Sequence, residues 1–217
     1  METTGFAAVF WDFGGVILSS PFDAFNEYER ANGLPIDFIR TVNSRHPDTN
    51  AWALIERREV DAVEFDHLFA AESEALGHRV PGRDVLGMLH GSVRPEMVTA
   101  LDRVIAAGFV TACLTNNVSS DRAAGTSDDH ARPEVDAVMA RFDHVIESSK
   151  VGCRKPEPQF YEIACAAAGV EPAQVVFLDD LGINLKPARA MGMTTIKVLS
   201  AAQAIDDLEA VLSIPLR

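Results

Sequence analysis

The stretch FAAVFWDFGGV, at residues 6–16, decides which fold we expect for this chain. Its first six residues are all apolar, and the run ends at Asp12, shortly before Gly14 and Gly15. A short apolar run that stops at a turn is typical of a strand buried on both faces of a parallel sheet. We therefore predict a buried strand over residues 6–11 that carries Asp12 at its carboxyl end.

Further apolar runs predict the other strands of the sheet: they occupy residues 109–114, 144–146, 175–178 and 194–198. Segments with the apolar spacing of helices lie between these runs and end at glycines: residues 95–108, 156–169 and 185–192. Strands that alternate with helices form βαβ units, which build a parallel sheet covered by helices on both faces. The sequence therefore predicts an α/β protein.

Residues 19–91 interrupt this alternation, because they contain no convincing buried strand. Apolar residues there follow helical spacing, and Asp61 with Glu64 forms the pattern that begins a helix. We predict a core domain from residues 1–18 and 92–217, with a helical cap domain at residues 19–91 inserted after the first strand. The polar stretch at residues 119–133 predicts a surface loop.

The net charge of the chain argues against two classes of function. The 217 residues carry a formal net charge of −13, which argues against broad binding to nucleic acid or to anionic membranes. A phosphate substrate remains compatible with this charge, because a bound metal ion can supply positive charge locally. The three cysteines show no metal-binding spacing, and the sequence has no signal-peptide pattern and no bilayer-spanning run, so we expect a cytoplasmic protein.

Chemically active side chains follow four of the predicted strands or their loops. Asp12 follows the first strand, Thr115 the second and the pair Asp179-Asp180 the fourth, while Lys155 lies in the loop after the third. Ligands of parallel sheets bind at the carboxyl ends of the strands, so we expect these side chains to converge on one edge.

This set of residue types suits phosphoryl transfer. A carboxylate can attack phosphorus and form an acyl-phosphate, and Thr115, the amides after it and Lys155 could donate to the phosphoryl oxygens. Mg²⁺ prefers hard oxygen ligands, for which Asp12 and Asp180 are the natural carboxylates. The residues alone therefore predict a magnesium-dependent site for phosphate chemistry.

Four segments carry a resemblance to a known family: FWDFGGV at 10–16, LTNN at 114–117, KPEPQF at 155–160 and FLDDLGIN at 177–184. Together they resemble the motifs of the haloacid-dehalogenase-like hydrolases. KPAR at 186–189 makes the chain most similar to the subgroup of the N-terminal phosphatase domain of soluble epoxide hydrolase. The resemblance implies a three-layer Rossmann-like core and identifies residues 19–91 with the family's helical cap.

The resemblance also implies the nucleophile and the metal site. Asp12 would be the nucleophile and a Mg²⁺ ligand, with Asp180 and the backbone carbonyl of Gly14 as further ligands. The implied substrate is a small-molecule phosphate ester, split through an aspartyl-phosphate intermediate. We expect the protein itself to be a monomer or a homodimer.

Further roles follow from the other motifs. Thr115, Asn116 and Lys155 would bind the phosphoryl group, and Lys155 would also neutralise charge on the nucleophile, which gives it a catalytic role. Asp179 and Asn184 would not contact the substrate but would hold these residues in place. Asp179 would orient Lys155 or a metal-bound water.

Gly14 departs from the family pattern. Phosphatases of this family usually carry an aspartate two residues after the nucleophile, which protonates the leaving oxygen and later activates water. Three outcomes stay open: another residue, for example from the cap, substitutes; the leaving group needs little protonation; or the chain is a weak or inactive, phosphate-binding or regulatory protein. A metal-free 2-haloacid dehalogenase is the poorer alternative, because those relatives usually have tyrosine at this position and lack the paired Asp179-Asp180.

Overall fold

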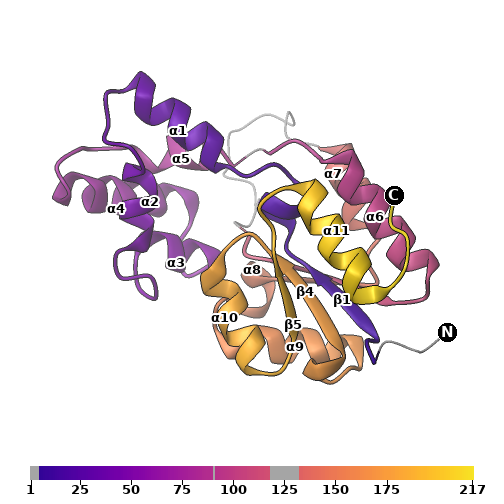
Figure 1. Cartoon of the computed structure of the whole chain (residues 1–217). Helices are drawn as coiled ribbons and strands as arrows, with labels where there is room; N and C mark the ends of the chain where they lie inside the picture. The colour runs from indigo at the N-terminus through magenta and orange to yellow at the C-terminus, as the bar shows by residue number, and fades with distance from the viewer. Residues whose placement is uncertain (1–4, 90, 118–131) are drawn as a thin grey trace.

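A single parallel sheet of five strands forms the centre of the computed structural model, which describes residues 5–89, 91–117 and 132–217. The strand order is β3-β2-β1-β4-β5, and every neighbouring pair is parallel. The strands are β1 (Ala8–Trp11), β2 (Val110–Thr115), β3 (His144–Glu147), β4 (Val175–Asp179) and β5 (Thr194–Lys197) (Figure 1). The predicted parallel α/β fold is thus confirmed, and all five predicted strands are present.

Helices cover both faces of the sheet, and three of them occupy the predicted positions. The helices of this part are α6 (Pro95–Ala106), α7 (Pro133–Met139), α8 (Ser148–Val151), α9 (Pro158–Ala168), α10 (Gly182–Ala190) and α11 (Ala201–Leu212), with a short 3-10 turn at Pro172–Gln174. Helix α11 was not predicted from the sequence, and its buried residues pack on the same face of the sheet as α6. The predicted surface loop lies outside the described residues as far as residue 131, and Pro133 begins α7.

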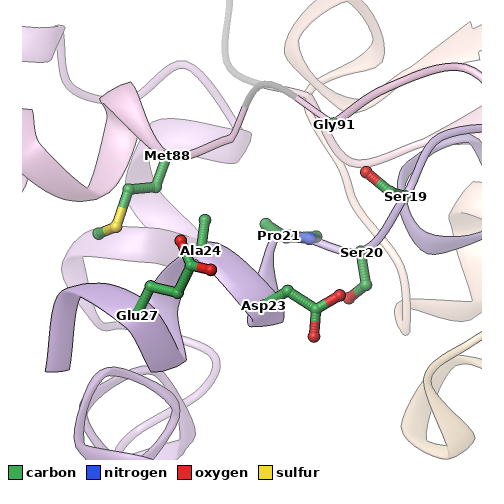
Figure 2. A pocket seen from close by; sticks show the side chains of 8 residues that line it. All are labelled: Ser19, Ser20, Pro21, Asp23, Ala24, Glu27, Met88 and Gly91. Carbon is green, nitrogen blue, oxygen red and sulfur yellow. The ribbon is translucent and has the colours of Figure 1, made fainter. Parts of the chain in front are cut away.

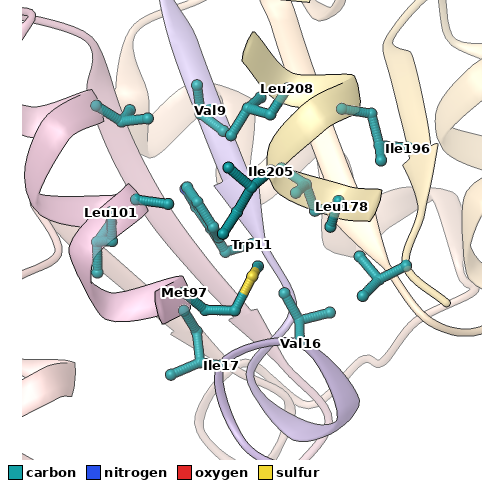
Figure 3. Packing of buried hydrophobic residues seen from close by; sticks show 14 of the residues in the cluster. Val9, Trp11, Val16, Ile17, Met97, Leu101, Leu178, Ile196, Ile205 and Leu208 are labelled. Atoms are coloured by element: carbon teal, nitrogen blue, oxygen red, sulfur yellow. The ribbon is translucent and has the colours of Figure 1, made fainter. Parts of the chain in front are cut away.

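Alternation along β1 divides the core into two layers. Val9 and Trp11 face a cluster formed with α6 and α11, whereas Ala8 and Phe10 face a second cluster formed with α9 and α10. Figure 3 shows the first cluster, with the Trp11 side chain lying among residues of both helices. Because β1 is fully buried between two layers, its residues must all be apolar, which explains the continuous run in the sequence.

The segment between β1 and α6 is helical and has a hydrophobic cluster of its own. Its helices are α1 (Phe22–Ala31), α2 (Phe38–Ser44), α3 (Ala51–Glu56), α4 (Ala62–Ala75) and α5 (Gly82–Gly87). Asp61 caps α4 by accepting from the backbone amides of Val63 and Glu64, as its position in the sequence predicts. Figure 1 shows these helices as a group beyond the end of the sheet, with α3 nearest to the core. We call residues 19–91 the helical segment.

The two connections of the helical segment run side by side. Leu18 forms an antiparallel bridge with Val93, and the amide of Ser19 donates to the carbonyl of Ser92 at 2.8 Å. A side chain at Gly91 would come within 2.5 Å of the carbonyl oxygen of Ser19, so only glycine allows this approach. Figure 2 shows a hollow at this junction, lined by residues of both connections and by Asp23, Ala24, Glu27 and Met88.

None of the helices in the described part of the chain combines the length and the apolar character needed to cross a bilayer.

The packing of α11 gives a first prediction. Leu208 on α11 is fully buried, whereas Leu199, just before this helix, is 75% exposed. Leu208→Ala should lower Tm by about 5–15 °C, because deleting a buried leucine leaves a cavity. Leu199→Ala is the matched control and should change Tm by less than about 2 °C. Thermal unfolding followed by circular dichroism measures both, and equal losses would contradict this packing.

Candidate active site

Asp12 lies at the carboxyl end of the central strand, where the chain turns sharply. Its backbone amide donates to the carbonyl of Leu178, which extends the pairing of β1 with β4 by one residue. Its carboxylate accepts from the amide of Phe13 at 2.7 Å, at the start of the tight turn Phe13–Ile17. These two contacts fix the carboxylate at the edge of the sheet, in a largely buried position.

Lys155 connects Asp12 with a second strand end. Its Nζ atom lies 2.8 Å from Asp12 Oδ1 and 2.8 Å from Asp179 Oδ2, and its side chain is only 1% exposed. Burial alone would lower the pKa of Lys155, but the charges of Asp12 and Asp179 outweigh it and raise the pKa. The lysine therefore stays protonated and supplies a fixed positive charge between the ends of β1 and β4.

Three carboxylates surround this lysine, which leaves the site with an excess of negative charge. One oxygen from each of Asp12, Asp179 and Asp180 lies within 4.8 Å of the others. Burial and the neighbouring Asp179 raise the pKa of Asp180 to about 6, and burial also raises the pKa of Asp12, against the effect of Lys155. Clustered carboxylates of this kind could hold a divalent cation, which would relieve their mutual repulsion.

The carboxylate of Asp179 is held by several hydrogen bonds besides its contact with Lys155. Besides Lys155, its carboxylate accepts from the amide of Leu181 at 2.8 Å and from the Asn184 side chain at 3.0 and 3.1 Å. The hydroxyl of Tyr161 in turn donates to the carbonyl of Asn184. With its oxygens occupied by these donors, Asp179 anchors the lysine, while the less buried Asp180 has the better position for a ligand.

The two glycines after Asp12 differ in their surroundings. Gly15 has a φ of 77°, and a side chain there would come within 2.2 Å of the Asp180 carboxylate, so glycine is required. Gly14 has a φ of −69°, and a Cβ atom would meet nothing within 4 Å. The backbone therefore permits other residues at Gly14.

Thr115 and Asn116 lie at the end of β2, on the same edge as Asp12. Thr115 is buried, and it pairs in register with Glu147 of β3. The Asn116 side chain exchanges two hydrogen bonds with the backbone of Lys155, accepting from its N–H and donating to its C=O, both at 2.9 Å. The Asn116 side chain thus holds the loop at residues 152–156, which we call the lysine loop.

Sequence reasoning missed two charged residues beside this site. Glu56, at the end of α3, is 5% exposed, and one of its oxygens lies 2.5 Å from Arg154 Nε and 3.3 Å from Asn116 Nδ2. A charged residue in a helical segment ordinarily faces solvent, so this burial could not be predicted from the sequence. Arg154 could have been predicted to lie near the site, because it directly precedes Lys155 in the sequence.

Comparison with known proteins identifies the class to which this fold and site belong. A family model described as haloacid dehalogenase-like hydrolase matches residues 6–192. The chain belongs to the haloacid dehalogenase-like hydrolases, and the resemblance drawn from its four segments is confirmed. Membership of this family makes the protein a hydrolase, as predicted.

Two individual relatives show how similar the chain is to known members of the family. The chain is 41% identical to bifunctional epoxide hydrolase 2 of Rattus norvegicus over 212 residues, which cover 93% of this chain but 38% of the rat protein. It is 25% identical over 194 residues to the sesquiterpene phosphatase astK of Aspergillus oryzae, with 88% of both chains covered. The chain spans well under half the length of the first mammalian relatives that it matches.

A solved structure shares the fold. It is a haloacid dehalogenase family enzyme from Bacteroides thetaiotaomicron, crystallised with magnesium and inorganic phosphate. The TM-score is 0.58 at 18% identity, over 88% of this chain and 93% of that one, so the likeness concerns the fold.

The surroundings of Asp180 predict a dependence of stability on pH in metal-free buffer. Its pKa is raised from 3.8 to about 6, so the folded state holds a proton that the unfolded chain has already released. This stabilisation is complete below the unfolded pKa and is lost as the pH rises through about 6. The Tm of the wild type minus that of Asp180→Asn should therefore fall by a few degrees between pH 4 and pH 7.

Asp136→Asn serves as the control for this measurement, because Asp136 is exposed on α7. Its difference from the wild type should stay constant over the same pH range. A constant difference for Asp180→Asn as well would contradict the burial of Asp180 beside Asp179.

Proposed function

We propose that the protein is a Mg²⁺-dependent phosphomonoesterase that acts on a small phosphorylated metabolite through an aspartyl-phosphate intermediate. The observation that carries this proposal is the Asp12 carboxylate, held by Lys155 and flanked by Asp179 and Asp180 at the ends of the two central strands. Support also comes from the relative named as a phosphatase and from the related enzyme crystallised with magnesium and phosphate.

Each residue of the site receives a role in this proposal. Asp12 attacks phosphorus, so that a bond forms between its oxygen and phosphorus while the bond to the ester oxygen breaks. Lys155 stabilises the negative charge on the phosphoryl oxygens, to which Thr115 and the amide of Asn116 donate. Water then hydrolyses the acyl-phosphate, which releases inorganic phosphate and restores Asp12.

The carboxylates of Asp12 and Asp180 and the carbonyl of Gly14 would hold Mg²⁺ in this proposal. The donor set fits the ion, because it consists of hard oxygens with excess negative charge. When bound, Mg²⁺ neutralises the charge that otherwise opposes the approach of an anionic phosphate ester. Asp179 and Asn184 keep Lys155 in position and contact the ion at most through water.

The helical segment, residues 19–91, acts in this proposal as a cap domain over the site. Its helices share a hydrophobic cluster separate from the two clusters that flank the sheet. Its two connections to the core run side by side, at Leu18 and Val93, which suits a movement of the segment as one body.

Replacing the nucleophile tests the proposed reaction. Asp12→Asn keeps the shape of the side chain but removes the charge that attacks phosphorus, so release of phosphate from an aryl phosphate with Mg²⁺ should fall by at least about 10³-fold. Asp136→Asn, at an exposed position of α7, should retain full activity. Phosphate release that survives Asp12→Asn, or that is unaffected by a chelator, would contradict the proposal.

Gly14→Asp tests the consequence of the missing proton donor. The backbone accepts a side chain at this position, so the variant should fold with an unchanged Tm. A carboxyl group there can protonate a leaving oxygen, and general acid catalysis contributes about 10²–10⁴-fold. We expect a rise of at least about tenfold in kcat for an alkyl phosphate and a smaller rise for an aryl phosphate, whose leaving group needs little protonation.

An alternative function is a phosphate-binding or regulatory protein without turnover, and the observation that favours it is Gly14. The same assays separate the two functions. Mg²⁺-dependent phosphate release by the wild type, absent in Asp12→Asn, excludes the alternative, whereas phosphate binding without release supports it.

A further inference from the structure

A buried ion pair joins the helical segment to the lysine loop of the core. Glu56 ends α3, and its oxygen lies 2.5 Å from Arg154 Nε. The two side chains are only 6% and 13% exposed. An ion pair removed from water is stable only when its geometry and its additional hydrogen bonds compensate for lost hydration. Each of these two buried charges is therefore stabilised by the other and by the contacts around the pair.

Arg154 holds the helical segment at a second point. Its Nη1 atom donates to the carbonyl of Pro47 at 2.9 Å, in the loop before α3. Pro47 and Glu56 both belong to the helical segment, whereas Arg154 precedes Lys155 in the core. A single guanidinium thus bridges the two parts of the molecule at the edge where Asp12 lies.

Glu56 also contacts the residue that orients the lysine loop. Its Oε2 atom accepts from Asn116 Nδ2 at 3.3 Å, and the Asn116 side chain holds both backbone groups of Lys155 at 2.9 Å. The ammonium group of Lys155 in turn contacts Asp12. A continuous series of side chains therefore connects α3 with the proposed nucleophile.

We propose that Glu56 is a positioning residue, which assembles the lysine loop when the helical segment is seated on the core. It orients Asn116 directly and the backbone before Lys155 through Arg154. This role concerns the site of the proposed function, and it makes full assembly of that site depend on closure of the helical segment.

The carboxylate of Glu56 is buried beside the guanidinium of Arg154. Burial raises the pKa of Glu56, and the charges of Arg154 and Lys155 oppose that rise. Its Oε2 atom accepts from Asn116 Nδ2, so the geometry suits orientation of Asn116.

A direct test measures hydrogen exchange of the Lys155 backbone amide by NMR, with no substrate present. This amide donates to Asn116 Oδ1, so its exchange reports whether Asn116 is held in place. Glu56→Ala should accelerate the exchange by at least about tenfold. Glu56→Gln keeps an oxygen acceptor for Asn116 and should lie between Glu56→Ala and the wild type.

Arg57→Gln is the matched control. Arg57 lies next to Glu56, and its guanidinium is 3.5 Å from Glu157, so it also bridges the helical segment and the core. Neither Asn116 nor Lys155 is among the partners of Arg57 in the described structure. Exchange of the Lys155 amide should therefore remain at the wild-type rate in this variant.

Kinetics supply the second readout. Glu56→Ala should lower kcat/KM for an aryl phosphate by at least about tenfold. The double variant with Arg154→Ala should be no worse than the more affected single variant, because both remove the same contact. If the wild type shows no turnover, the proposed function fails, and the exchange of the Lys155 amide still tests the role of Glu56.

Two results would overturn the inference. In the first, Glu56→Ala accelerates exchange within α3 while the Lys155 amide keeps its wild-type rate, which would show that the ion pair only seats the helix. In the second, the effects of Glu56→Ala and Arg154→Ala on kcat/KM are fully additive, which would show that the two residues act independently.

Discussion

The buried contact of Lys155 with Asp12 and Asp179 is the interaction on which the rest of the site depends. A lysine removed from water loses several kcal/mol of hydration unless carboxylates replace it, and here two carboxylates do so at 2.8 Å each. They come from the ends of β1 and β4, so the ammonium group also fixes these neighbouring strand ends relative to each other. Without it, the clustered carboxylates would face one another at an edge with little access to water.

Much of the fold and part of this site could be predicted from the sequence, because the signals are local. A fully buried strand needs continuous apolar residues, and the parallel sheet then brings Asp12, Thr115 and Asp179 to one edge whatever the details of packing. Even α11 carried a usable signal, since Ala204, Ile205 and Leu208 follow the spacing of a helix face.

The contacts that orient the site could not be predicted in the same way, because their partners are distant in the chain. Glu56 and Asn116 are sixty residues apart, and nothing in either neighbourhood distinguishes a buried glutamate from a solvated one. The amide side chain of Asn116 could equally have met a ligand, and only the tertiary structure shows it bound to the backbone of Lys155. Motif spacing thus predicted which side chains meet at this edge of the sheet, whereas the arrangement of supporting residues required coordinates.

The two glycines after Asp12 constrain the chemistry in opposite ways. Gly15 is imposed by the approach of Asp180, whereas the backbone at Gly14 leaves room for the side chain of a proton donor that this chain does not have. Glu56 is a buried carboxylate that the helical segment brings to the lysine loop, where it pairs with Arg154 and accepts from Asn116. In the proposed reaction, an ester whose leaving oxygen is weakly basic would lose least from the missing proton donor at Gly14, because such an oxygen departs without receiving a proton.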